Sequence, residues 1–391
     1  MIRGFLRLLF LLEFFQHVCS AVIPPIVDLE SSNKITVIYL IPTDVVLVDD
    51  HHKKIPDFLS LMNQFYKQHL NKTSDACKGL DFEFKHSAVD VHVVKGSKRA
   101  ESYQRLRNSK YALWGSDPQL IEHMEQQYVL FVAGVDRFSD GSWGRGNMVD
   151  DDYGGVLIAG GLLGREDVSL SLLEQIKRER VLFPNEVKKW DRFPVSHFLF
   201  TLIHEVGHSL GLLHEYRTGP DVMGKADVRV MFDFFLNENI TQAFVSDDNL
   251  QVLRRSPYLN FNNKSVSKSE FPPMASIDIE EQLDEPYSVL LKGNVEGGGG
   301  SLLLQYYLDL RYEVKNETGR TFMKRDTGLL QTELVTGVDN VLEKRFKLGA
   351  FINTTSVSGD DRKLKAYAIH LQVIDEQGRI VRADANIINV D

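Results

Sequence analysis

The sequence predicts a mixed α/β (α+β) domain followed by a small antiparallel β-sandwich. A chain of 391 residues exceeds what one hydrophobic core usually organises, so two domains are expected. In the first two thirds, β-branched runs accompany a segment with apolar residues at helical spacing, which is typical of a layer of strands and helices. In the last third the hydrophobic period changes to two, which indicates antiparallel strands.

The first domain is expected to begin with a buried strand at residues 34–41, which are mostly β-branched or apolar. Residues 57–70 carry apolar side chains at helical spacing and predict a helix. Further strands are predicted at residues 88–94, 128–133 and 154–158. The order of a strand, a helix and more strands is the basis for the mixed α/β prediction.

Glycines and aspartates dominate the stretch between the last two of these strands, at residues 136–146 and 150–154. Their composition predicts a loop. Carboxylates are suitable ligands for Ca²⁺, but the loop lacks the spacing of a dedicated calcium site, so a solvated acidic turn is the favoured interpretation. Calcium therefore stays an open alternative without a specific motif.

Polar residues and prolines at 261–273 predict a linker. Beyond the linker, apolar and polar residues alternate at 367–373, and a polar turn leads into a further strand at 380–387. No motif in this part predicts a function. The predicted organisation is a first domain at 34–260, a linker at 261–273 and a β-sandwich at 274–391.

The N-terminus has the layout of a cleaved signal peptide. Arg3 and Arg7 precede an apolar run, and small residues follow it. Glu13 interrupts that run, which is too short for a membrane span of about 20 apolar residues. We therefore expect residues 1–20 to be removed, residues 21–33 to form a short N-terminal segment, and the protein to be secreted to the extracellular space. A buried N-terminal helix is the alternative.

The rest of the composition fits a secreted glycoprotein. Five Asn-x-Ser/Thr sequons are acceptors for glycans on a eukaryotic secretory route, at Asn71, Asn239, Asn263, Asn316 and Asn353. Cys77 is the only cysteine after the leader, so stability without an internal disulfide is expected, with either a buried thiol or an intermolecular partner. The formal charge of -9 argues against nucleic acid as a partner.

A histidine motif from His204 onwards is the strongest functional signal. Ser196 can cap an apolar helix that leads into the motif. His204 and His208, four residues apart, lie on one face of that helix, so both imidazoles can bind one metal ion. Gly211 permits the strained backbone that ends the helix, and the resulting turn brings His214 to the same ion. Helix-face histidines without a metal are the alternative interpretation.

Three neutral imidazoles are the ligand set of a catalytic zinc site, because tetrahedral zinc then keeps one position for water. Glu205 can act as general base toward that zinc-bound water and return the proton to the leaving amine. One catalytic Zn²⁺ and hydrolysis of peptide bonds are therefore expected. A downstream glutamate could take the place of His214, but Glu238 and Glu280 lie in no clean helical repeat.

The segment from His204 to His214 resembles the elongated zinc signature of the metzincin metallopeptidases, in which a methionine-containing turn follows under the metal. Met223 supplies the methionine here, with an ordinary core methionine as the alternative. The short step from His214 to Met223 is similar to the matrix metalloproteinase type, whereas Glu215 resembles the astacins. The subfamily is therefore unassigned.

The resemblance implies an upper subdomain at 34–208, with a twisted sheet and helices, and a smaller lower one at 209–260. It also implies that the edge strand of the sheet binds extended substrate, for which residues 154–160 are the candidate and an internal strand is the alternative. The astacin tyrosine that supports the oxyanion is missing after Met223. Zinc alone or another donor must then stabilise that charge; Tyr216 is one candidate, although a tyrosine with no catalytic role is favoured.

Such peptidases usually carry an inhibitory pro-segment, for which only residues 21–33 remain here. The enzyme is therefore expected to be made active, with Asp28 as the alternative zinc ligand of a very short pro-segment. The sequence as a whole predicts a secreted zinc-dependent endopeptidase acting on proteins or peptides. The alternatives are a catalytically silent zinc-binding or interaction protein, against which Glu205 argues, and a hydrolase of a non-peptide amide or ester.

Overall fold

The computed structural model places residues 34–391 in one compact unit. The described residues are 34–71, 77–85, 88–105, 128–133, 144–149, 153–159, 171–182, 195–215, 221–224, 229–236, 245–261, 273–282, 287–297, 300–315, 321–336, 339–349, 351–352 and 362–390. The predicted leader and the short segment after it lie outside them. Within the described part of the chain, no helix is long and apolar enough to cross a membrane.

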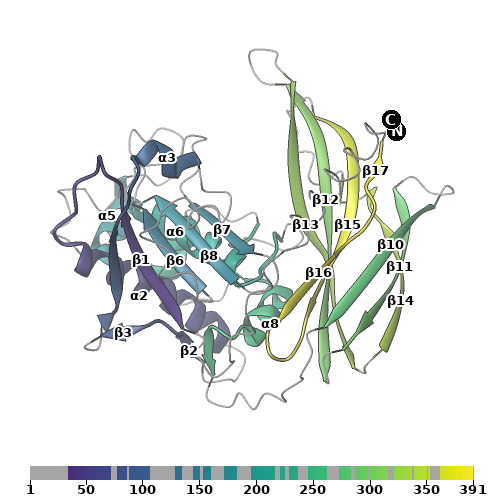
Figure 1. The fold of residues 1–391 in the computed structure, drawn as a ribbon, viewed down its shortest axis with the longest axis horizontal. Coiled ribbons are helices and arrows are strands. Elements are labelled where there is room, and N and C mark those ends of the chain that lie inside the picture. The colour runs from purple at the N-terminus through teal and green to yellow at the C-terminus, as the bar shows by residue number, and fades with distance from the viewer. Residues whose placement is uncertain are drawn as a thin grey trace, which may run out of the picture. The chain divides into compact units, whose positions relative to one another are not determined.

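A five-stranded sheet organises the first hydrophobic core (Figure 1). Its order is β5 (Val91–Lys95), β1 (Ile35–Ile41), β6 (Tyr128–Ala133), β8 (Tyr153–Ala159) and β7 (Gly144–Val149). The first four strands run parallel, and β7 runs antiparallel to β8. All seven residues of β1 are buried, which explains its β-branched and apolar composition.

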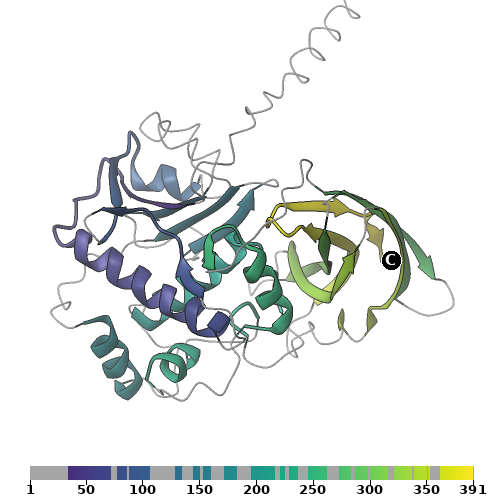
Figure 2. The same ribbon diagram turned by 90° about the horizontal axis from the view of Figure 1, so that it is seen from below.

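Two long helices pack in this core, α2 (His51–Asn71) and α6 (Val195–Ser209). Figure 2 shows α2 lying along one face of the sheet. Phe58 of α2 packs edge to face on Phe198 of α6, with ring centroids 4.9 Å apart. The hydroxyl of Tyr66 donates a hydrogen bond of 2.6 Å to the carbonyl of Ile203, directly before the histidine motif. These contacts fix the position of α6.

Shorter elements accompany the five-stranded sheet and its two long helices. The helices are α3 (Ala100–Arg105), α5 (Leu172–Leu182), α7 (Arg229–Leu236) and α8 (Asp247–Arg255), and the small strand pairs are β2 (Cys77–Leu80) with β9 (Leu259–Phe261) and β3 (Phe84–Lys85) with β4 (Ala88–Val89). Cys77 is buried, and its sulfur accepts a hydrogen bond of 3.3 Å from Gly79 N. Of the two expectations for this cysteine, a buried thiol or an intermolecular partner, the structure agrees with the buried thiol.

Two antiparallel sheets enclose a second core. One contains β10 (Met274–Gln282), β11 (Ser288–Glu296) and β14 (Asp339–Lys347); the other contains β13 (Thr321–Thr336), β12 (Ser301–Lys315), β15 (Arg362–Ile374) and β16 (Ile380–Asp384), with β17 (Ile388–Asn389) paired to β15. On β12 the side chains alternate: Leu302 and Leu304 lie in the second core, whereas Leu303 lies in the first. The larger sheet therefore packs on both cores.

Most of the predicted elements agree with these strands and helices. The strands at 34–41, 128–133 and 154–158 correspond to β1, β6 and β8. The helix predicted at 57–70 begins earlier, at His51. The strand predicted at 88–94 is divided at Asp90 into β4 and β5. The mixed α/β prediction and the presence of two packed antiparallel sheets are thus supported, while the predicted domain limits stay predictions.

Two expectations about the sheet are wrong. Residues 144–146, predicted as part of a loop, belong to β7, because main-chain pairing with β8 holds a strand whose glycines gave no sequence signal. The candidate edge strand at 154–160 corresponds to β8, which lies between β6 and β7; β7 is the edge. Residues 153–154 of the predicted loop likewise belong to β8, and residues 136–143 and 150–152 lie outside the described residues, so the calcium alternative stays open.

Candidate metal centre

Helix α6 carries the first two histidines of the motif, and a buried carboxylate caps its start. Glu179 of α5 accepts hydrogen bonds from Val195 N at 2.6 Å, Ser196 N at 2.9 Å and Ser196 Oγ at 2.7 Å. The prediction that Ser196 caps the helix is therefore wrong, because its hydroxyl donates to Glu179 from within the first turn. A negative charge at this helix end is also favourable to the helix dipole.

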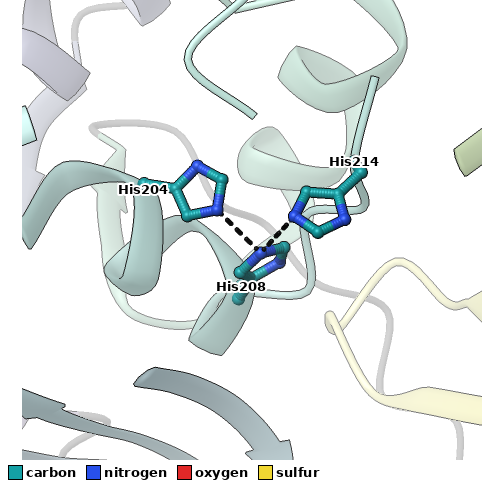
Figure 3. A group of neighbouring side chains, drawn as sticks. All are labelled: His204, His208 and His214. Atoms are coloured by element: carbon teal, nitrogen blue, oxygen red, sulfur yellow. Dashed lines mark hydrogen bonds between the residues drawn. The ribbon is translucent and has the colours of Figure 1, made fainter. Parts of the chain in front are cut away.

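The three predicted ligands come together at the end of α6 (Figure 3). Nε2 of His208 lies 3.1 Å from Nε2 of His204 and 3.0 Å from Nε2 of His214. His204 and His208 come from successive turns of α6, and His214 comes from the segment that follows the helix. The ligand atoms all lie within 4.8 Å of one another, so one metal ion can reach all three.

The other ring nitrogens of two of the imidazoles, His204 and His208, face main-chain carbonyls. His204 Nδ1 lies 2.7 Å from Val222 O, and His208 Nδ1 lies 3.0 Å from Leu212 O. A carbonyl oxygen can only accept, so both Nδ1 atoms donate, and in the neutral imidazole Nε2 then presents a lone pair. Several lone pairs converging at about 3 Å repel one another unless a cation lies among them. This residue set therefore fits a zinc ion.

Burial keeps His208 and His214 in the form that binds metal. Loss of hydration lowers the pKa of His208 well below its usual value, and the other two imidazoles lower it further. Burial likewise lowers the pKa of His214 to about 4, with a smaller effect from His204, while a hydrogen bond to the main chain of Thr327 acts in the opposite direction. At neutral pH both rings are neutral and can coordinate a cation.

Gly211 ends the helix as predicted. Its φ of +94° lies in the region that disfavours side chains, and Leu212 N donates a hydrogen bond of 2.9 Å to Gly207 O across the turn. The chain then reverses and reaches His214 three residues later. The glycine in the motif therefore has a backbone role, and the expectation about its conformation is confirmed.

Met223 lies fully buried directly beneath the motif. A Cβ at Gly207, between the two helical ligands, would lie 2.6 Å from the sulfur of Met223, so the methionine touches the helix backbone there. Glu215 N donates to Met223 O at 3.1 Å, and Glu215 pairs with Gly224 in a parallel bridge. The turn that contains Met223 is therefore joined to the segment that carries the third ligand.

Asp221 holds this turn, a role that the motif search missed. Its carboxylate accepts hydrogen bonds from Met223 N at 2.6 Å and from Ser246 N at 2.5 Å. Burial raises the pKa of Asp221 to about 7, although both hydrogen bonds act to lower it. An aspartate two residues before a turn residue is a common turn signal, so the sequence contained a clue to this role.

The other residues proposed from the sequence differ in their distance from the histidine cluster. Glu205 lies on α6 beside His204 and is half-buried. Glu280 lies in β10 and pairs with Lys292 at 3.0 Å, which places it in a surface ion pair rather than in the histidine cluster. Tyr216, Glu238 and Asp28 lie outside the described residues.

The fold is similar to that of known structures, although no family model and no curated protein matches the chain. Wild-type OgpA from Akkermansia muciniphila matches with a TM-score of 0.51 and 14% identity, covering 92% of this chain and 95% of that chain. Catalytically inactive OgpA in complex with an O-glycopeptide (glycodrosocin) substrate matches with a TM-score of 0.49 and 13% identity, covering 91% and 92%. The first match shows a shared fold over nearly the whole chain.

Proposed function

We propose that this chain is a secreted zinc-dependent endopeptidase with His204, His208 and His214 as zinc ligands and Glu205 as general base. The observation that carries the proposal is the convergence of three Nε2 atoms while Nδ1 of His204 and of His208 faces a carbonyl acceptor. This is the donor set and tautomer of a catalytic zinc site. The fold shared with OgpA, an enzyme of this architecture, supports a hydrolase.

Each residue then has a definite task. Zinc, when bound, supplies Lewis-acid polarisation of the scissile carbonyl and a water molecule acidified enough to lose its proton near neutral pH. Glu205 takes that proton and delivers it to the leaving nitrogen. Met223 and Asp221 keep the floor of the site in place through contacts with Gly207 and Ser246.

Strand β7 is the element that we propose binds the peptide main chain. It is the edge of the five-stranded sheet and pairs with β8 on its inner side. It also packs closely with α6, the helix that carries the two ligands. An extended peptide added to the outer side of β7 would form main-chain hydrogen bonds and pass the histidine cluster. Strand β7 therefore takes the place of residues 154–160 as the candidate edge strand for substrate binding.

Export remains part of the proposal and rests on the N-terminal sequence. Of the five sequons, Asn71 is described: it is the exposed last residue of α2, and its side chain bonds with the main chain of Cys77. N-terminal sequencing of protein recovered from the medium of eukaryotic cells tests cleavage near residue 20. Retention of the leader on intracellular protein would contradict export.

The function is tested with the purified full chain beside Glu205→Ala and Glu205→Gln. Casein, a quenched peptide library, and one peptide with and without an O-linked glycan serve as substrates, the last pair because OgpA has been crystallised with an O-glycopeptide. A panel of simple amides and esters is run in parallel. We expect about one zinc in each protein and cleavage of peptides by the wild type, with a loss of about 10²-fold or more in both variants.

Each other result selects an alternative. Zinc without cleavage of any substrate would support the silent binding protein, and cleavage of simple amides or esters alone would support a non-peptide hydrolase. Cleavage that survives in both Glu205 variants would contradict its role as base. Wild-type protein without zinc would contradict the metal centre itself.

A further inference from the structure

The segment that carries the third ligand is held at each of its carbonyl groups. Between the helix end and the third histidine, four successive carbonyls each accept a hydrogen bond from a different residue. The pairs are Gly211 O with Gln372 Nε2 at 2.9 Å, Leu212 O with His208 Nδ1 at 3.0 Å, Leu213 O with Asn249 Nδ2 at 3.1 Å, and His214 O with Leu329 N at 2.8 Å. The path of this segment is therefore fully specified.

Two of these four donors belong to the larger of the two antiparallel sheets that enclose the second core. Gln372 lies on β15 and Leu329 on β13, both more than a hundred residues beyond the motif. The same face of this sheet contributes Leu303, Ile374 and Ile380 to the first hydrophobic core. These hydrogen bonds therefore lie within an extended apolar interface between this sheet and the first core.

The ring of His214 has a partner from the same sheet. Its Nδ1 lies 3.4 Å from the hydroxyl oxygen of Thr327 on β13, two residues before Leu329. The corresponding nitrogens of His204 and His208 bond to carbonyls of Val222 and Leu212, which belong to the first core. A partner at Nδ1 fixes the tautomer and the plane of a metal-binding imidazole. Of the three histidines, only His214 has this partner on a sheet of the second core, at Thr327 of β13.

Gln372 is held so that its amide cannot turn over. Its Nε2 donates to Gly211 O and to Gln305 Oε1, and its Oε1 accepts from Arg382 Nε at 3.0 Å. A flipped amide would place oxygen against two acceptors and nitrogen against a donor. The fully buried side chain is therefore a rigid bracket on the turn after α6.

We propose that the sheet of β13, β12 and β15 is a structural part of the metal centre and that Thr327 is the positioning residue of His214. This inference rests on the proposed zinc function. It assigns the C-terminal sheets a role that no sequence motif suggested: they hold the third ligand in place for zinc. Zinc affinity is then a property of both cores together.

The test measures zinc affinity on the full chain by competition with a chromogenic chelator. Thr327→Val removes the side-chain acceptor at nearly constant size and leaves the main chain of Thr327 in place, Thr327→Ser keeps the hydroxyl, and Thr336→Val makes the same change at an exposed position of the same strand. We expect about 10-fold weaker zinc binding for Thr327→Val, within the 10- to 100-fold range of such partners. Thr327→Ser and Thr336→Val are expected to remain within about threefold of wild type.

Cobalt(II) absorption spectra give a second readout that does not depend on catalysis. Thr327→Val is expected to shift the d–d bands because the third imidazole reorients, whereas Thr336→Val leaves them unchanged. Unchanged affinity and unchanged spectra in Thr327→Val would overturn the inference. Equal weakening in Thr327→Val and Thr336→Val would also overturn it, since a general loss of fold would then be the cause.

The result is separable from the outcome for the proposed function. If the wild type binds zinc and cleaves peptide while Thr327→Val matches it, the zinc peptidase stands and the role of Thr327 falls. If the wild type binds no zinc, both fall together. Should Thr327→Val be poorly folded, Thr327→Ser with its intact hydroxyl still decides: a loss of zinc in this variant contradicts positioning by the hydroxyl.

Discussion

The two proposed zinc ligands on α6 and the proposed ligand beyond it are held in different ways. His204 and His208 lie four residues apart on one helix, so their separation follows from helical geometry alone. His214 lies on an irregular segment whose position depends on contacts with Asn249, Leu329 and Thr327. The geometry of the helical pair is therefore set by local structure, whereas the place of His214 depends on tertiary contacts as well.

This difference predicts which changes will release zinc. A perturbation confined to the start of α6 leaves the spacing of His204 and His208, which lie in the later part of the helix, and the contacts of the segment around His214 intact. A perturbation of the segment from Gly211 to Glu215 moves one ligand relative to the other two. Zinc affinity is therefore expected to be tolerant of the first kind of change and sensitive to the second.

The largest effect is expected from Gly224→Ala. A Cβ at this position would lie 1.6 Å from Glu215 O, so the turn and the segment next to His214 must separate. We expect a loss of about 3 kcal/mol or more in unfolding free energy and zinc binding at least about 100-fold weaker. Gly349→Ala is the control, because nothing lies within 4 Å of the added atom. Urea unfolding and chelator competition measure both quantities. Wild-type zinc affinity in Gly224→Ala would show that the segment around His214 does not control zinc binding.

Glu179→Ala is the matching change at the start of α6. It removes the carboxylate that accepts from Val195 N, Ser196 N and Ser196 Oγ. We expect a loss of about 2–3 kcal/mol in stability, because these are buried bonds to a charged group, but zinc affinity within about threefold of wild type. Glu174→Ala, which changes an exposed glutamate of α5, the helix that also carries Glu179, should cost about 1 kcal/mol or less. Zinc loss comparable to that of Gly224→Ala would show that the helical pair is not autonomous.

The third prediction concerns the pH dependence of the metal-free protein. The folded state holds the pKa of His214 at about 4, below the ordinary value of 6.5, so the folded chain resists the proton that the unfolded chain takes up. Stability contributed by the neutral ring is thus complete above pH 6.5 and lost as pH falls toward 4. Asp221, with its pKa raised to about 7, has the opposite sign, because its contribution improves as pH falls through that value.

The two effects are separated by comparing wild type with His214→Gln, since Asp221 is present in both. Between pH 7.5 and pH 5 we expect the stability difference between the two proteins to decrease by about 1–2 kcal/mol, as the ring remains partly exposed. Urea unfolding of chelator-treated protein at the two pH values gives this difference. A constant difference would show that His214 titrates normally in the folded chain.

Sequence patterns predicted the elements whose signal is local. The β-branched run of β1 and the helical spacing of α2 correspond to buried positions of the first core. Strand β7 was missed because glycines in a paired edge strand resemble glycines in a loop, and only β8 as a neighbour distinguishes them. The carboxylate that caps α6 was missed for a related reason, since Glu179 lies on another helix, α5.

At the candidate site, too, the sequence predicted the local spacing but not the contacts from distant segments. The spacing of His204, His208, Gly211 and His214 predicted a cluster that the structure brings together. The spacing could not predict Thr327 or Gln372, because their sequence separation from the motif is 113 and 161 residues and single threonines and glutamines carry no pattern. Supporting contacts of this kind become visible only after the two cores are packed.

The smallest effect should come from Gly211→Ala, at the junction between the helical pair and the third ligand. Its φ of +94° costs a residue with a Cβ about 1–2 kcal/mol. Gly297→Ala is the matched control, since its φ of +88° carries a similar backbone cost in a turn between β11 and β12. Both variants should therefore lose similar unfolding free energy, while only Gly211→Ala weakens zinc binding, by roughly 10-fold, because the strain falls on the segment that carries His214. Equal zinc affinity in the two variants would mean that the bonds from Gln372 and Leu329 hold His214 in place regardless of how the helix ends, and the β-sheet contacts would then be the dominant determinant of the third ligand.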